Sequence, residues 1–190
     1  MNKKVIIIEG CDNCGKDTLI SSLSSDFKNP LILHAGVPSA KESNLFNFYN
    51  NGLIHNTLEG YYDKDHDVII HNRSMYGEFV YGPLYRSKLP GNVAEMIYKL
   101  EAGQLKTFIR SSELYFILLT SSSVELLVNN DDGLSISNKK EDIKREIDSF
   151  NTIFNLSEIE NKRKIYVNHG DSFRNKQDIY NDVVNFIRNK

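Results

Sequence analysis

The sequence predicts an α/β fold, in which a parallel, five-stranded β-sheet is covered by helices on both faces. The first observation behind this prediction is that short apolar runs, typical of buried strands, alternate with segments whose apolar residues have helical spacing. The second is that the first such run, Val5 to Ile8, leads through a glycine-bounded loop into a helix. Strands that alternate with helices along a chain pair in parallel, with the helices packed on the sheet.

Each element follows from its own pattern. The expected strands are residues 5–8, 30–34, 67–71, 113–120 and 164–168. The expected helices have apolar stripes at Leu19, Leu23 and Phe27; Leu45, Phe46, Phe48 and Tyr49; Val93, Met96, Ile97 and Leu100; Ile143, Ile147, Phe150 and Phe154; and Ile179, Val183, Phe186 and Ile187. A short helix through Val128 follows possible N-caps at residues 121–123, and Asn-Asn-Gly at residues 50–52 is expected to break a helix.

Composition narrows the class of protein. A chain of 190 residues, 40% hydrophobic and 25% charged, suits a single soluble domain spanning residues 1–190. The net charge of -2 gives no electrostatic footprint for nucleic acid, and no apolar run is long enough for a signal peptide or a membrane span. We therefore expect a cytoplasmic protein that binds neither nucleic acid nor a membrane.

The loop between the first strand and the first helix has the composition of a phosphate-binding loop. Gly10 and Gly15 adopt backbone angles closed to other residues, so that successive N–H groups converge on phosphate oxygens. The following helix N-terminus adds partial positive charge, and Lys16 adds a full one. These features predict a cradle for a triphosphate.

The residue after the lysine is unusual for such a loop. A serine or threonine normally follows and its hydroxyl holds Mg²⁺, whereas here Asp17 follows and Thr18 comes next. A carboxylate beside phosphates is repelled unless a cation lies between them. Asp17 therefore either faces away from the phosphates or binds Mg²⁺, directly or through water, and Thr18 is the second candidate ligand.

The loop also holds both cysteines of the chain, Cys11 and Cys14. Their spacing is shared by redox pairs and by half of a zinc site, but the histidines are scattered singly along the chain. We interpret the thiols as small loop-filling side chains. The alternative is that their oxidation to a disulfide distorts the loop and stops nucleotide binding.

Polar side chains follow the third expected strand. Asn72, Arg73 and Ser74 come directly after residues 67–71, at the edge of an open α/β sheet where ligands bind. The guanidinium of Arg73 matches the geometry of a phosphate, so we expect it to bind one.

These motifs resemble those of the thymidylate kinase family of P-loop nucleoside monophosphate kinases. The resemblance rests on Asp12 in an E-G-x-D pattern, on Asn72-Arg73, on Tyr81-Gly82 and on the long carboxyl-terminal helices; the run from Gly77 to Arg86 is similar to that of bacteriophage members. It implies a P-loop NTPase fold of three α/β/α layers. It also implies transfer of the γ-phosphate of ATP to a deoxynucleoside monophosphate, with dTMP as the leading acceptor and Mg²⁺ as cofactor.

The resemblance also implies roles for individual residues. Lys16 and Arg73 would be catalytic, with Arg73 bound to the acceptor phosphate and Asp12 to the acceptor sugar. Glu78, Tyr81 and Arg86 are candidates for the acceptor pocket. The donor would be held by Gly10, Cys11, Asn13, Cys14, Gly15, Lys16, Asp17 and Thr18, with its adenine near His169 to Asp171. A lid at about residues 121–142 and a homodimer are further family traits.

The sequence departs from the family pattern at three places. Asn72 replaces the acid of a D-R motif, residues 34–38 replace an arginine-rich acceptor motif, and residues 121–138 contain no arginine. Two other functions therefore stay open. One is a deoxynucleoside kinase in which Glu9 is the base toward the sugar hydroxyl; the other is a nucleotide-binding regulator without catalysis.

Overall fold

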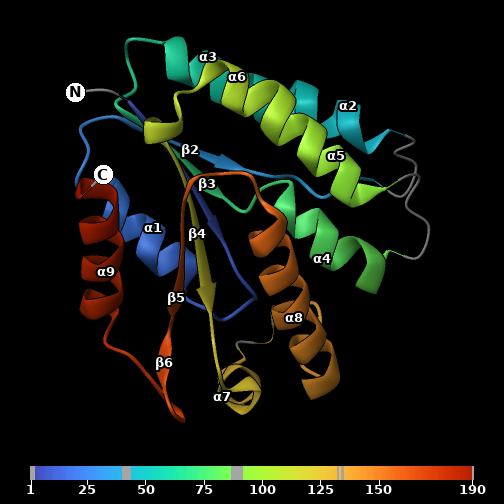
Figure 1. Ribbon diagram of the computed structural model, residues 1–190. Coiled ribbons are helices and arrows are strands. Elements are labelled where there is room, and N and C mark those ends of the chain that lie inside the picture. The colour runs from blue at the N-terminus through green and yellow to red at the C-terminus, as the bar shows by residue number, and fades with distance from the viewer. Residues whose placement is uncertain (1–2, 40–43, 87–91, 132, 134, 190) are drawn as a thin grey trace.

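The structure is a computed structural model that describes residues 3–39, 44–86, 92–131, 133 and 135–189. Its centre is a five-stranded parallel sheet with the strand order β2-β3-β1-β4-β5 (Figure 1). The strands are β1 (Lys4–Glu9), β2 (Pro30–His34), β3 (Val68–Asn72), β4 (Leu114–Thr120) and β5 (Asn161–Tyr166). The predicted fold class is confirmed. Because β1 and β3 are adjacent and parallel, the loops that follow them leave the same edge of the sheet. The direction of the strand order changes beside β1, which is where ligands bind in open α/β sheets.

Helices cover both faces of this sheet. The two on one face are α1 (Lys16–Ser24) and α9 (Lys176–Arg188), which pack on each other. The other face is covered by α2 (Leu45–Tyr49), α3 (His55–Tyr62), α4 (Tyr76–Tyr85), α5 (Val93–Leu100), α6 (Lys106–Phe108) and α8 (Lys140–Leu156), and the short α7 (Val124–Asn129) precedes α8 (Figure 1). A small hairpin of β6 (Asn168–His169) and β7 (Ser172–Phe173) leads into α9.

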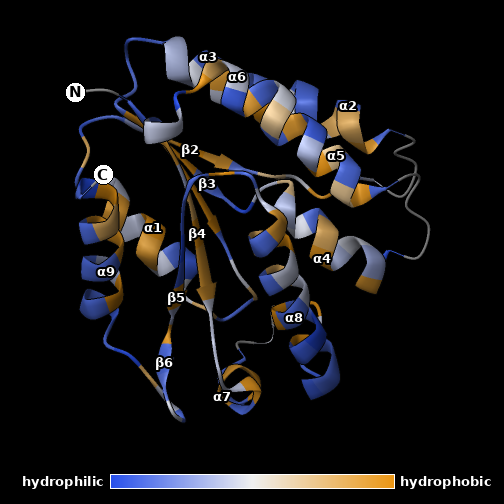
Figure 2. Cartoon of the chain, in the orientation of Figure 1, coloured by the Kyte–Doolittle hydropathy of each residue, from blue (hydrophilic) through white to orange (hydrophobic). Residues whose placement is uncertain are grey.

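The core lies along the central strands. Every residue of β4 is buried, as are Val5 to Glu9 of β1, and Figure 2 shows the hydrophobic colour concentrated in the sheet while the outer sides of α8 and α9 are hydrophilic. Continuous apolar strands form here because helices cover them on both sides. No helix in the described part of the chain is long and apolar enough to pass through a membrane.

Three predicted elements differ from the structure. The first helix ends at Ser24, where turn hydrogen bonds to Leu23 and Ser24 take over, so Phe27 packs on the core from beyond the helix. The Asn-Asn-Gly segment is not a break: residues 50–54 form a π-helical turn that joins α2 to α3 without interruption. The last strand begins at Asn161 instead of Lys164, because its charged residues belong to an edge strand.

Candidate active site

The loop after β1 has the backbone geometry that its glycines predict. Gly10 has a φ of 147° and Gly15 a φ of 76°, both in the left-handed half of conformational space. A Cβ at Gly10 would also lie 2.2 Å from the Leu119 carbonyl oxygen of β4, so no larger residue fits there. Asn13 shares the left-handed conformation with a φ of 63°. The loop therefore wraps tightly in front of α1.

Lys16 reaches back over this loop. Its ammonium group donates hydrogen bonds to the carbonyl oxygens of Gly10 at 2.8 Å and Cys11 at 2.7 Å, and it lies 3.9 Å from a carboxylate oxygen of Asp12. The side chain is 5% exposed. The ammonium group is thus held inside the loop by two carbonyl oxygens, with the Asp12 carboxylate as a more distant counter-charge. A phosphate bound in the loop would add further negative charge as a partner.

Arg73 approaches the loop from the tip of β3. Its guanidinium donates to a carboxylate oxygen of Asp12 at 2.5 Å, and its backbone has a φ of 66°. The bend is braced from beneath by Glu9, whose carboxylate accepts hydrogen bonds from the backbone N–H of Ser74 at 2.6 Å and from its hydroxyl at 2.7 Å. Burial raises the pKa of Glu9 to about 7, although the hydrogen bonds from Ser74 lower it in part. Sequence reasoning did not find this bracing role.

Asn72, the neighbour of Arg73, joins β3 to α1. Its side-chain amide donates to a carboxylate oxygen of Asp17 at 2.6 Å, and its own amide oxygen is buried without a partner. Asp17 and Thr18 are exposed at the start of α1. These oxygens are the hard ligands that Mg²⁺ prefers, so the residues present fit a magnesium ion that keeps several of its waters. Groups of three or more acidic, histidine or cysteine side chains suited to a metal are absent from the described residues.

The sequence-predicted residues come together around one cavity of about 400 Å³. Those that line it are Asp12, Asn13, Gly15, Lys16, Asp17, Thr18 and Arg73, with Asn130, Ser135 and Phe173. The last three were not predicted from the sequence. The cavity is therefore lined by the glycine-bounded loop with its lysine and by an arginine from the tip of β3, a set of groups that suits phosphate binding.

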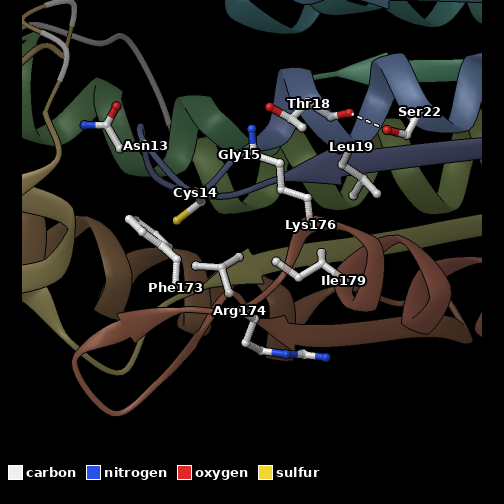
Figure 3. A pocket seen from close by; sticks show the side chains of 11 residues that line it. Asn13, Cys14, Gly15, Thr18, Leu19, Ser22, Phe173, Arg174, Lys176 and Ile179 are labelled. Atoms are coloured by element: carbon white, nitrogen blue, oxygen red, sulfur yellow. Dashed lines mark hydrogen bonds between the residues drawn. The ribbon is translucent and has the colours of Figure 1, made fainter.

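A second cavity of about 210 Å³ adjoins the loop, between α1 and the start of α9. Figure 3 shows Cys14 and Phe173 toward one end of it and Leu19 and Ile179 toward the other. Phe173, at the end of the β6–β7 hairpin, lines both cavities. An apolar cavity beside a phosphate site suits a nucleobase. His169 and Gly170, which were expected near the donor adenine, line a different cavity with Ser122 and do not line the one beside the loop.

The segment expected to be a lid touches the loop directly. The Asn13 side-chain amide donates to Asp131 at 3.2 Å and to the Ser135 hydroxyl at 3.1 Å. The lid prediction covers residues 121–142, of which 132 and 134 lie outside the described residues. The contact covers the tip of the loop with neutral and acidic groups, in keeping with the absence of arginine from residues 121–138.

The α4 cluster consists of Glu78, Tyr81 and Arg86, on and just after this helix: Glu78 pairs with Arg86, whereas Tyr81 lies within electrostatic reach of Asp12 and Arg73. The carboxylate of Glu78 accepts hydrogen bonds from the Tyr49 hydroxyl at 2.9 Å and from Arg86 at 2.7 Å. One carboxylate oxygen of Glu78, the Nε of Arg86 and the Tyr81 hydroxyl are buried without partners. None of the three residues lines either of the two cavities described above. The cluster nevertheless holds polar atoms that a ligand would satisfy.

Comparisons with known proteins agree on the architecture. No family model matches the sequence, and no match was found among curated proteins. Among solved structures, the YorR protein from Bacillus subtilis, in complex with phosphorylated GDP, is similar with a TM-score of 0.69, 17% identity and coverage of 97% of this chain and 96% of that one.

Two further solved structures are similar over almost the whole chain. Thymidylate kinase from Candida albicans has a TM-score of 0.59 and 16% identity, covering 99% of this chain and 92% of that one. Deoxyadenosine kinase from M. mycoides, with dCMP and a flexible dCDP bound, has a TM-score of 0.52 and 13% identity, covering 98% and 100%. This chain, with its five-stranded parallel sheet, phosphate loop and flanking helices, therefore has the P-loop NTPase fold found in nucleotide kinases.

Proposed function

We propose that the protein is a deoxynucleoside monophosphate kinase, which transfers the γ-phosphate of ATP to a deoxynucleoside monophosphate, with dTMP as the leading acceptor. The similarity to structures described as thymidylate kinase and as a complex with phosphorylated GDP supports this class of substrate. The resemblance of the Asp12 and Arg73 motifs to thymidylate kinases supports it independently.

The observation that carries the proposal is that Lys16 and Arg73 line one cavity together, with Asp12 between them as a shared ion-pair partner. A monophosphate acceptor is already an anion, so the transfer requires alignment of two phosphates and neutralisation of their charge rather than a strong base. Lys16 and the loop amides align and neutralise the donor phosphates, and Arg73 aligns and neutralises the acceptor phosphate. Asp12, which binds Arg73, holds the guanidinium in place until the acceptor arrives.

Magnesium supplies charge neutralisation between the donor phosphates when it is bound. Asp17 and Thr18 are the residues proposed to hold it, and Asn72 orients Asp17 through its amide hydrogen bond. The donor base is proposed to occupy the cavity lined by Leu19, Phe173 and Ile179.

The position of Glu9 favours a phosphate acceptor over a sugar hydroxyl. A hydroxyl acceptor requires a base within hydrogen-bond reach. Glu9 is 0% exposed, lines neither cavity and is bonded through one oxygen to Ser74. Its role is to support the bend that carries Arg73, and this disfavours the deoxynucleoside kinase alternative.

Glu78, Tyr81 and Arg86 are proposed to bind the acceptor nucleoside. Their unpartnered atoms offer both hydrogen-bond acceptors and donors, and a nucleobase edge presents both kinds of group. Closure of the segment at residues 121–142 over the phosphates and assembly as a homodimer are further parts of this proposal.

The decisive test is a panel of acceptors. The protein is incubated with ATP and Mg²⁺, or with Mn²⁺, and with each deoxynucleoside monophosphate or the matching nucleoside, and nucleotide products are separated by chromatography. We expect diphosphate products, with dTMP among the best acceptors, and no product from nucleosides. Products from nucleosides alone would establish the deoxynucleoside kinase. ATP binding without transfer to any acceptor would establish a regulator, and either outcome would overturn the proposal.

A further inference from the structure

The thiols of Cys11 and Cys14 have no part in the phosphoryl transfer proposed above, although both lie inside the loop. They are the only cysteines of the sequence, and both are free and 2% exposed. A buried dithiol at the centre of a nucleotide site is a chemically reactive group placed where a small change of backbone shape affects binding.

The backbone between the two cysteines brings them close together. The N–H of Cys14 donates to the carbonyl oxygen of Cys11 at 3.4 Å, which closes a four-residue turn with Asn13 in the left-handed conformation at its third position. Such a turn holds its first and last Cα atoms within about 7 Å. Disulfides span Cα separations of about 4.4–6.8 Å. A disulfide between these two residues is therefore compatible with the fold.

The two sulfur atoms already interact. A hydrogen bond from the Cys11 thiol lowers the pKa of Cys14; burial opposes this effect and the positive charge of Lys16 adds to it. The same hydrogen bond and burial raise the pKa of Cys11. One thiol of the pair is thus the nucleophile and the other is the resolving thiol.

The nucleophilic thiol also lies next to an open space. Cys14 lines the cavity of about 210 Å³, and Figure 3 shows its sulfur directed toward the side formed by Phe173. A small oxidant that enters this cavity therefore lies beside Cys14. The proposed donor nucleotide occupies the same cavity.

We propose that Cys11 and Cys14 are a redox modification site, oxidised by peroxides to a reversible disulfide that weakens binding of nucleotide phosphates. The Cys14 thiolate attacks one oxygen of hydrogen peroxide, the O–O bond breaks, and a sulfenic acid and a hydroxide form; the hydroxide takes up the proton that the Cys14 thiol had lost and becomes the first water. The Cys11 sulfur then attacks the Cys14 sulfur, the S–O bond breaks, and the disulfide and a second water form. Two electrons pass from the dithiol to the peroxide.

The effect on binding follows from the contacts of the turn. A disulfide bond of about 2.05 Å is much shorter than the separation of two hydrogen-bonded thiols, so the ends of the turn are drawn together. Asp12 and Asn13 lie at its tip, where Asp12 binds Arg73 and Asn13 binds Asp131 and Ser135. Oxidation therefore moves the phosphate-binding amides and disturbs two neighbouring contacts at once. This inference rests on the proposed function in that the loop is taken to bind the donor.

The test compares ATP and tripolyphosphate binding by calorimetry before and after hydrogen peroxide treatment. Intact mass confirms loss of two hydrogen atoms, and dithiothreitol reverses it. We expect oxidised wild type to lose at least about tenfold in affinity for both ligands. The variants C11S and C14S, each compared with its own untreated form, keep their affinity because neither forms the disulfide.

The outcomes separate this inference from the proposed function. A verified disulfide with unchanged affinity overturns the inference, as does an equal loss on oxidation in both serine variants. Failure of the reduced wild type to bind ATP at all refutes the donor site itself, whatever oxidation does. The comparison of oxidised with reduced wild type needs no variant, so it stays informative if a serine variant does not fold.

Discussion

Asn72 donates its side-chain amide to the carboxylate of Asp17 at 2.6 Å, which joins the tip of β3 to the first turn of α1. This contact links two unusual residues that are 55 positions apart: Asn72, which stands where a D-R motif has an acid, and Asp17, which stands where a phosphate-binding loop normally has a serine or threonine. An acid is missing at the strand tip and an acid is gained after Lys16. Two carboxylates at this separation would repel each other, so the pair keeps one carboxylate beside the phosphate cavity and gives it a neutral donor.

The exchange of the two side chains leads to the first prediction. The single variants D17T and N72D are each expected to weaken Mg²⁺-dependent ATP binding by about tenfold. D17T removes the carboxylate of Asp17, and N72D places a second carboxylate beside it. The double variant D17T/N72D again has one carboxylate and is expected to recover most of the loss. Calorimetric titration with ATP at several Mg²⁺ concentrations measures this, with EDTA as the control. Additive losses in the double variant would show that the two residues act independently.

Substitution of Arg73 tests the acceptor side. R73A is expected to raise the KM for the monophosphate by about 10²-fold, since a guanidinium holds phosphate through paired hydrogen bonds, and R73K to restore only part of it. The affinity for ATP should change little. Steady-state kinetics with each substrate varied in turn make the distinction. R188A, at an exposed arginine in the last turn of α9, is the matched control. An unchanged KM in R73A would remove Arg73 from the acceptor site.

Phe173 was missed by sequence reasoning and lines both cavities. Stacking of a base on an aromatic ring contributes about 1–3 kcal/mol. F173A is therefore expected to weaken ATP binding by about tenfold or more, while binding of tripolyphosphate, which has no base, stays the same. F173L preserves apolar volume and separates stacking from simple burial. Equal losses for ATP and tripolyphosphate would mean that Phe173 supports the loop and does not contact the base.

Burial of Glu9 predicts a pH-dependent stability. Its pKa is about 7 in the folded protein against an ordinary value of 4.5, so between these values the folded chain binds more protons than the unfolded chain. The contribution of Glu9 to stability is therefore fully present below pH 4.5 and is lost as the pH rises through about 7. E9Q has no titrating group at this position. Its free energy of unfolding relative to that of wild type should therefore rise by on the order of 2 kcal/mol between pH ~5 and ~8.

Urea unfolding followed by circular dichroism at several pH values measures this difference. Glu146, whose pKa burial also raises to about 7, is present in both proteins and cancels from the comparison. A constant gap between E9Q and wild type across the range would contradict the assignment to Glu9.

The ion pair of Glu78 and Arg86 predicts a change in stability. The Glu78 side chain is fully buried and Arg86 is partly exposed. E78Q leaves a guanidinium without its counter-charge, so it should destabilise the protein by roughly 3 kcal/mol. The double variant E78Q/R86Q removes both charges and should recover part of that loss. Chemical denaturation of the two variants and wild type gives the answer, and equal stability of E78Q and wild type would refute a strong pair.

Local requirements explain what could be predicted from the sequence. The apolar run of β1, the left-handed glycines at 10 and 15 and the charge of Lys16 are each set by a few neighbouring residues, and the structure contains all of them as expected. The N-cap at Ser123 is of the same kind, since its hydroxyl accepts from Leu126 only three positions away.

Contacts between distant segments explain what could not be predicted. Glu9 meets Ser74 across 65 positions, and Asn13 meets Asp131 across 118. No local pattern in the sequence encodes either partner. The π-helical turn at residues 50–54 was missed for a related reason. Packing of α3 on the sheet and of α2 on α5 keeps the helix continuous through an Asn-Asn-Gly segment that would end it in isolation.

Arg73 adopts a left-handed backbone that an arginine disfavours by about 1 kcal/mol or more. Glycine would accept that conformation without strain, so R73G would relieve the backbone while it deletes the guanidinium that we propose binds the acceptor phosphate. Screens that select heat-resistant variants by removing backbone strain should therefore assay activity at this position separately.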